Sequence, residues 1–91
     1  MALLKKDGKY VFIDRTGKEV LTPPYYDVQD FSEGLALVKK YGEYGFIDKT
    51  GKEVVLPQYD YAESFSGGLA RVYKDGKYVF IDRKNRVIFY Q

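Results

Sequence analysis

The chain repeats itself every 34 residues, and this recurrence constrains its fold more than any other feature of the sequence. The segment GKYVFID begins at Gly8, returns as GEYGFID at Gly42 and returns again at Gly76. Likewise, FSEGLALVKK from Phe31 returns as FSGGLARVYK from Phe65. A fixed period of this length is typical of repeat proteins, in which each unit packs mainly against its neighbours. We therefore predict a single repeat domain over residues 1–91, divided into units 1–34, 35–68 and a shorter 69–91.

The residue types within each unit favour β-strands over helices. Glycine occurs every few residues, β-branched and aromatic residues lie between the glycines, and no amphipathic helical stretch of useful length is present. We predict an all-β fold of about nine strands, in which each unit is a three-stranded antiparallel meander and the units form a propeller-like or a superhelical array. The expected strands are 2–6, 35–40 and 69–74, then 10–13, 44–47 and 78–81, then 19–21, 53–56 and 86–89.

The expected turns carry residues that accept a left-handed backbone. Asp7–Gly8 and Asp75–Gly76 are typical two-residue hairpin turns, whereas Tyr41–Gly42 is a weaker signal at the same position. A second turn, which begins with aspartate, follows the middle strand of each unit. Its fourth residue is glycine in two copies and Asn85 in the third, and asparagine is the next most tolerant residue. Backbone geometry therefore explains this substitution.

Two connectors, Pro23–Gly34 and Pro57–Gly68, join the units. Proline prevents the third strand from continuing, and glycine frees the backbone where the next unit starts. Within the second connector, the spacing of Asp60–Glu63 matches a capping box and predicts a short helical turn. Phe31 and Phe65 are predicted to anchor the connectors on the sheets.

The second unit matches one known repeat pattern at a long series of positions: Gly42, Tyr44–Asp48, Thr50–Glu53, Pro57, Tyr59–Asp60, Phe65–Ser66 and Gly68–Ala70. In these residues the chain resembles the WG repeat family, a β-rich repeat of bacterial proteins. Tyrosine stands for the signature tryptophan at Tyr10, Tyr44 and Tyr78, and valine stands for its glycine at Val11 and Val79. The resemblance implies an accessory or interaction module and not a reaction. The close likeness of the copies also suits an engineered or consensus-derived repeat.

The residue types argue against an enzyme. Cysteine and histidine are absent, which removes thiol nucleophiles, thiolate metal sites and the commonest general base. Asp48–Lys52 resembles a phosphorylated-aspartate motif, but the same aspartate recurs in turn position at Asp14 and Asp82, so we interpret it as a turn residue. We predict no catalytic residue, no metal ligand and no cofactor. The connector carboxylates are interpreted as solvated caps: Asp27, Asp30, Glu33, Asp60 and Glu63.

Net charge and hydropathy limit the classes of partner that we expect this chain to bind. With 15 basic and 13 acidic residues the formal charge is +2, far from the positive balance of a nucleic-acid binder. No apolar run is long enough to span a membrane, and the amino end lacks the layout of a signal peptide. We expect a soluble protein, compatible with the cytoplasm, that binds neither nucleic acid nor membrane.

These observations predict a non-enzymatic β-repeat scaffold that binds a protein partner, or copies of itself, through its exposed end units. The alternative is a carbohydrate or cell-wall binding module that uses tyrosines of the connectors, because flat amphipathic rings dominate recognition surfaces. The tyrosines that recur in the middle strands are interpreted as structural. The candidate partner-binding residues are Tyr25, Tyr26, Tyr59 and Tyr61.

Overall fold

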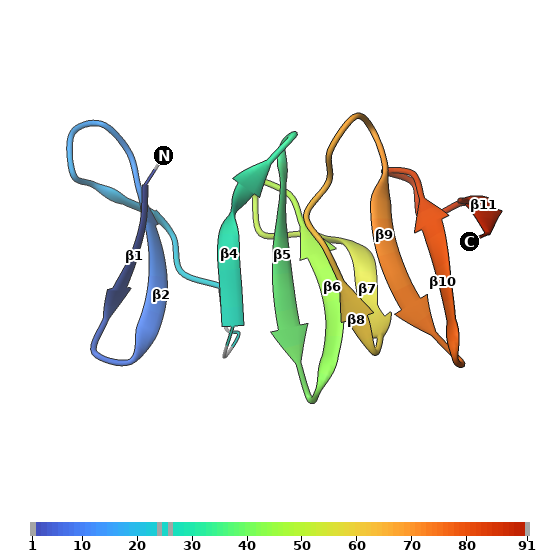
Figure 1. Cartoon of the computed structure of the whole chain (residues 1–91). Helices are drawn as coiled ribbons and strands as arrows, with labels where there is room; N and C mark the ends of the chain where they lie inside the picture. The colour runs from blue at the N-terminus through green and yellow to red at the C-terminus, as the bar shows by residue number, and fades with distance from the viewer. Residues whose placement is uncertain (1, 24, 26, 91) are drawn as a thin grey trace.

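The computed structural model describes residues 2–23, 25 and 27–90, and none of these residues is helical. Eleven strands form three antiparallel sheets (Figure 1). Sheet 1 contains β1 (Ala2–Lys6), β2 (Lys9–Ile13) and β3 (Glu19–Leu21). Sheet 2 contains β4 (Asp27–Ser32), β5 (Leu35–Lys40), β6 (Glu43–Ile47) and β7 (Glu53–Tyr59). Sheet 3 contains β8 (Tyr61–Ala62), β9 (Ala70–Lys74), β10 (Lys77–Ile81) and β11 (Val87–Tyr90). The predicted all-β fold of consecutive antiparallel meanders is confirmed.

The two connectors add a strand each, which accounts for the difference from the nine strands expected. β4 pairs with β5, and β8 pairs with β9. The helical turn predicted over residues 60–63 is wrong, because Tyr61 and Ala62 pair with Tyr73 and Val72 instead. The pairing occupies backbone groups along the outer edge of β9, which a local helical turn would leave to water. Sheets 2 and 3 therefore begin within a connector and have four strands.

The turns have the backbone geometry that the sequence predicts. Asp7, Tyr41 and Asp75 have φ angles of 51°, 51° and 52°, and the glycine after each is also left-handed. Asn85 has a φ of 62° and is therefore left-handed, like Gly17 and Gly51 at the equivalent positions. The turn after each middle strand is closed by a backbone hydrogen bond from its fourth residue to the carbonyl of its aspartate.

The sheets pack in chain order, and alternate residues of sheet 2 face opposite neighbours. We call the face turned toward the next sheet the forward face and the face turned toward the preceding sheet the rear face. The forward face of sheet 2 shares a hydrophobic core with sheet 3 and carries Leu35, Leu37, Tyr44, Phe46 and Val55. Its rear face packs on sheet 1 and carries Ala36, Val38, Gly45 and Ile47. The middle strand β6 is therefore covered on both sides, as its apolar sequence predicts.

The connector phenylalanines anchor each connector on the sheet that precedes it. The ring centroid of Phe31 lies 4.6 Å from that of Phe12, and the centroid of Phe65 lies 4.7 Å from that of Phe46. Phe12, Phe46 and Phe65 are fully buried. Each pair joins a connector residue to the middle strand of the preceding sheet, so the predicted anchoring role is confirmed.

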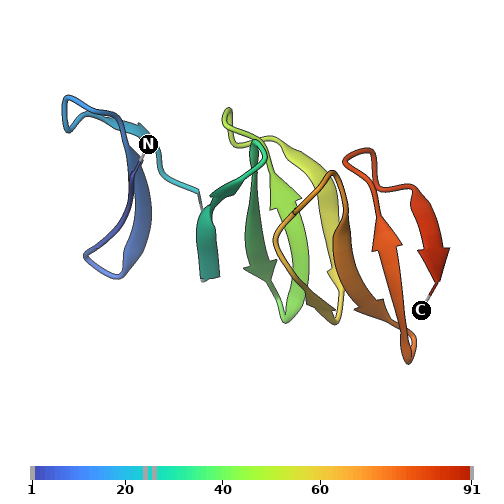
Figure 2. The same ribbon diagram turned by 45° about the horizontal axis from the view of Figure 1, so that its top comes forward.

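The sheets form an open, elongated row with principal extents of 42 × 26 × 16 Å. Figures 1 and 2 show the two ends of the chain at opposite ends of this row. The described residues form no closed barrel. The propeller-like or superhelical arrangement expected for the units stays a prediction.

Candidate interaction surfaces

Two of the predicted tyrosines donate a hydrogen bond to the sheet that follows them in the chain. The hydroxyl of Tyr25 donates to Oε2 of Glu53 at 2.6 Å, and the hydroxyl of Tyr59, which stands 34 residues later, donates to Oδ1 of Asn85. Burial raises the pKa of both phenols, and the carboxylate of Glu53 raises that of Tyr25 further. Tyr59 is only 5% exposed. The role of these two rings in holding the sheets together leaves Tyr59 with little surface for a partner.

The other two predicted tyrosines do not complete a shared site. Tyr61 is 42% exposed on β8, and its ring lies edge-on to that of Tyr44, with centroids 5.9 Å apart. Tyr26 lies outside the described residues. Tyr25 packs with the core between sheets 1 and 2, whereas Tyr59 belongs to the core between sheets 2 and 3. The structure therefore does not gather the described candidate tyrosines on one surface.

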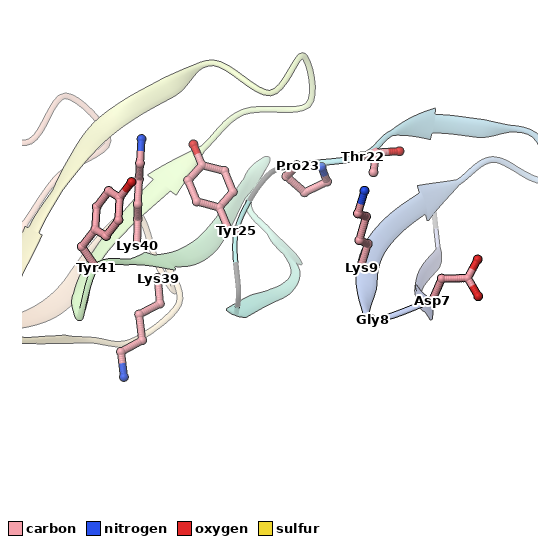
Figure 3. Close-up of a pocket in the computed structure, with 9 residues that line it drawn as sticks. All are labelled: Asp7, Gly8, Lys9, Thr22, Pro23, Tyr25, Lys39, Lys40 and Tyr41. Atoms are coloured by element: carbon pink, nitrogen blue, oxygen red, sulfur yellow. The ribbon is translucent and has the colours of Figure 1, made fainter.

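A cleft of about 540 Å³ lies between the first hairpin and sheet 2 (Figure 3). Its lining residues are Asp7, Gly8, Lys9, Thr22, Pro23, Tyr25, Lys39, Lys40 and Tyr41. Figure 3 shows Lys9, Lys40 and Tyr25 on one side of the ribbon and Lys39 on the other. The Nζ of Lys39 lies 5.2 Å from the centroid of the Tyr44 ring, so this cation is already engaged.

Tyr41 is a second aromatic residue of this cleft, and the sequence analysis did not select it. Tyr41 is 85% exposed, and the Nζ of Lys40 lies 5.9 Å from the centroid of its ring. A tyrosine with positive φ is strained, and the two equivalent turns carry Asp7 and Asp75. The sequence signal for this residue was an aromatic side chain at a turn position where the other two copies carry aspartate.

The turn carboxylates act on their own backbone. Oδ1 of Asp48 accepts hydrogen bonds from the backbone N–H groups of Thr50 and Lys52, at 2.8 Å and 3.1 Å. The hydrogen bond from the Thr50 hydroxyl lowers the pKa of Asp48, and the equivalent threonine does the same at Asp14. At Asp82 the backbone hydrogen bond from residue 86 is the main cause of a lowered pKa. These contacts confirm that the aspartates are turn residues.

Glu33 does more than the solvated cap that its sequence position suggests. Its Oε2 accepts from the N–H of Gly67 at 2.7 Å, and its Oε1 accepts from the N–H of Gly68 at 2.8 Å. The carboxylate therefore links one connector turn to the next one along the chain. The change from FSEG to FSGG between the copies was the signal, because only the first copy carries the acceptor. Among the described residues, no group of three or more acidic side chains could hold a metal ion.

The rear face of sheet 1 is apolar and open to solvent over much of its area. Leu4 is 49% exposed and Val20 is 46% exposed, while Val11 is buried beside them. Because Leu4 pairs with Val11 in the ladder, the two side chains share the face opposite to the one that packs on sheet 2.

The forward face of sheet 3 is aromatic and carries one charge pair. The rings of Tyr73 and Tyr78 meet edge-on with centroids 4.6 Å apart. The guanidinium of Arg71 lies 4.3 Å from the centroid of the Tyr78 ring, and its terminal nitrogen lies 3.1 Å from Oε2 of Glu63. Beside them is a hollow of about 430 Å³, lined by Glu63, Ser64, Ser66, Leu69, Arg71 and Phe80.

Successive sheets of equivalent sequence, tied by equivalent contacts, define this molecule as a tandem β-repeat protein. The family model for the WG containing repeat matches residues 12–44 and again residues 44–78. These two matches cover most of the chain, which therefore belongs to the WG repeat family. Comparisons with curated proteins and with solved structures found no match. The described part of the chain contains no helix long and apolar enough to cross a membrane.

Proposed function

We propose that this β-repeat module is a non-enzymatic scaffold that binds protein through the outer faces of its end sheets. The observation that carries the proposal is the rear face of sheet 1. It keeps apolar residues at four positions whose equivalents lie between packed sheets elsewhere in the molecule: Ala2, Leu4, Val11 and Ile13. Apolar side chains that are exposed together on one face, as Ala2 and Leu4 are, mark interaction sites.

The internal packing of the molecule indicates the kind of surface that such a face binds. In sheets 2 and 3 the equivalent face lies against the apolar face of another β-sheet. Complete burial of a side chain such as Leu4 stabilises a complex by about 1.5–3 kcal/mol. The expected partner therefore presents a β-sheet with an apolar face, from another protein or from a copy of this chain.

The chemistry of the side chains supports a binding role over a catalytic one. Histidine and cysteine are absent from the sequence. The carboxylates of Asp14, Asp48 and Asp82 are occupied by hydrogen bonds within their own turns. Glu33 is occupied between two connectors. Acid–base catalysis needs carboxylates that converge on a substrate, and these instead stabilise separate turns.

The proposal is tested by offering sheet 1 a neighbour in the same chain. A second copy of residues 35–68, joined in frame before the first unit, would present its forward face to the rear face of sheet 1. We expect amide hydrogen exchange in β1 and β2 to slow by about tenfold or more, since the added sheet buries Leu4 and Ile13. The control is a flexible glycine- and serine-rich extension of the same length. Unchanged exchange in the extended chain would contradict the proposal.

A carbohydrate-binding function is the second candidate, and Tyr41 is the observation that favours it. Its ring stands open at the cleft beside Tyr25 and Pro23, in a turn where aspartate is better suited. Flat rings with a polar edge are suited to stacking against ligands in such clefts. We expect Tyr41→Asp to abolish any quenching of tyrosine fluorescence by oligosaccharides while the fold is kept. Tyr61→Ser is the matched control, and an unresponsive wild-type chain across a glycan panel would eliminate this candidate.

A further inference from the structure

We infer that the partner of the end faces is a second copy of this chain, joined head to tail. The forward face of sheet 3 in one copy packs on the rear face of sheet 1 in the next. This inference rests on the function proposed above and commits it to one partner and one register.

The rear face of sheet 1 is equivalent in sequence to the rear faces of sheets 2 and 3. Each of those two faces is covered by the preceding sheet of the same chain. The equivalent positions in sheets 1, 2 and 3 are Ala2, Ala36 and Ala70; Leu4, Val38 and Val72; Val11, Gly45 and Val79; and Ile13, Ile47 and Ile81. All the apolar members in sheets 2 and 3 are buried. In sheet 1, by contrast, Ala2 and Leu4 are exposed and Ile13 is half-buried. The interface that would cover them already exists within the chain.

The forward face of sheet 3 is the matching half of that interface. It carries Leu69, Tyr78 and Phe80 where sheet 2 has Leu35, Tyr44 and Phe46. Two positions of β9 change: Arg71 stands in place of Leu37, and Tyr73 stands in place of Lys39. Arg71 lies against the Tyr78 ring and is paired with Glu63, so this change adds no isolated charge to the face.

The positions of the two faces dictate the geometry of association. They are turned away from each other at opposite ends of the row, as the ends of the chain are in Figures 1 and 2. Two different faces of the same chain make a heterologous contact, which repeats until a ring closes or a filament grows. The pairing of unlike faces also distinguishes this arrangement from a symmetric dimer.

Light scattering of the 91-residue chain over a range of concentrations tests the inference. We expect the average mass to rise with concentration. Leu4→Glu and Tyr78→Glu each place a carboxylate in the contact, and each should raise the dissociation constant by about 100-fold. We expect the second variant to fold as a monomer, because the guanidinium of Arg71 lies beside residue 78 and can pair with the new carboxylate. Leu56→Glu, on the exposed part of β7 outside both faces, should leave association unchanged.

Mixing the two variants tests the head-to-tail register. The Leu4→Glu chain keeps an intact sheet 3 face and the Tyr78→Glu chain keeps an intact sheet 1 face, so an equimolar mixture should form a dimer that grows no further. Circular dichroism checks that both variants are folded, and Val20→Glu replaces Leu4→Glu if that variant is not. The inference would be overturned if the wild-type chain had the mass of a monomer at every concentration. It would also be overturned if the Tyr78→Glu chain still self-associated in the absence of the other variant. Slowed exchange in the extended chain would then leave the proposed function standing.

Discussion

The middle sheet and the two end sheets are built from the same repeat, yet they differ at the glycine that helps to define the family. Gly45 occupies this position in sheet 2, whereas Val11 and Val79 occupy it in sheets 1 and 3. A Cβ on residue 45 would lie 2.5 Å from the carbonyl oxygen of Val55 and 2.7 Å from the nitrogen of Pro57. The course of the neighbouring strand therefore decides which residue this position accepts.

The neighbouring strand explains the difference. In sheet 2, β7 continues for seven residues and its register with β6 shifts on both sides of Phe46, so its backbone approaches Gly45 closely. In sheet 3 the register is regular at this point, and Val79 pairs directly with Tyr90. In sheet 1 the short β3 pairs only with Phe12 and Ile13. The glycine is thus required by a bulged third strand and not by the repeat as such.

The largest difference in stability between the middle sheet and an end sheet should appear when the phenylalanine of the middle strand is replaced by alanine. Phe46 is fully buried and packs on Phe65, whereas its equivalent Phe80 is partly exposed. We expect Phe46→Ala to lower the free energy of unfolding by about 4 kcal/mol, and Phe80→Ala by about half as much. Urea denaturation measures both values. Equal losses would show that the position of a sheet in the row does not govern its contribution to stability.

Substitution of the family glycine should give the next largest effect. Gly45→Ala should lower the free energy of unfolding by about 2 kcal/mol, because the added methyl group meets backbone atoms that cannot move independently. Val79→Ala places the same residue at the equivalent position of sheet 3 without a clash, so its loss of stability comes from the two deleted methyl groups alone. Alanine normally stabilises a strand relative to glycine. An unchanged or increased stability of Gly45→Ala in urea would therefore disprove the explanation by the bulge.

Removal of the carboxylate between the connectors should have a smaller effect. Glu33→Ala deletes both hydrogen bonds to the N–H groups of Gly67 and Gly68, and we expect a loss of about 1 kcal/mol. Hydrogen exchange of those two amides should quicken with it. Asp30→Ala provides a control, because the Asp30 carboxylate accepts from the adjacent N–H of Phe31, far from residues 67 and 68 in the sequence. Amide exchange at residues 67 and 68 that is the same in both variants would rule out the link.

The smallest effect concerns a feature that the three sheets share. Hydrogen bonds lower the pKa of Asp14, Asp48 and Asp82 below 3.8 in the folded chain. Carboxylates with a lowered folded pKa stabilise the fold above the unfolded pKa, and this contribution disappears as the pH falls through the folded pKa. The contribution of these groups to thermal stability should therefore stay constant with pH above about pH 4, and the unfolding temperature should fall below that pH. Asp48→Asn should flatten part of this acid limb, and an unaltered acid limb would speak against the assignment.

The local signals in the sequence predicted most of the strands and turns. Left-handed backbone at Asp7, Tyr41 and Asn85 follows from residues within each turn, so one sequence is enough to locate it. The anchoring role of Phe31 and Phe65 was also predicted from the sequence, because a phenylalanine recurs at this position just before the next unit. The candidate site was predicted less well. Tyr59 is buried and its hydroxyl donates a hydrogen bond to Asn85 of the next sheet. Tyr41, which lines the cleft, was not selected as a candidate binding residue.

What the sequence determined by itself was the period, the antiparallel meander and the places where the chain reverses, since these depend on residues close together along the chain. Only the tertiary structure decided that the connectors become strands, that Glu33 spans two connectors and that Gly45 faces a bulge. It also decided which face of each sheet is covered. The physical reason is that these features arise from contacts between backbone groups and side chains of different strands, and the composition of either strand alone does not specify how they meet.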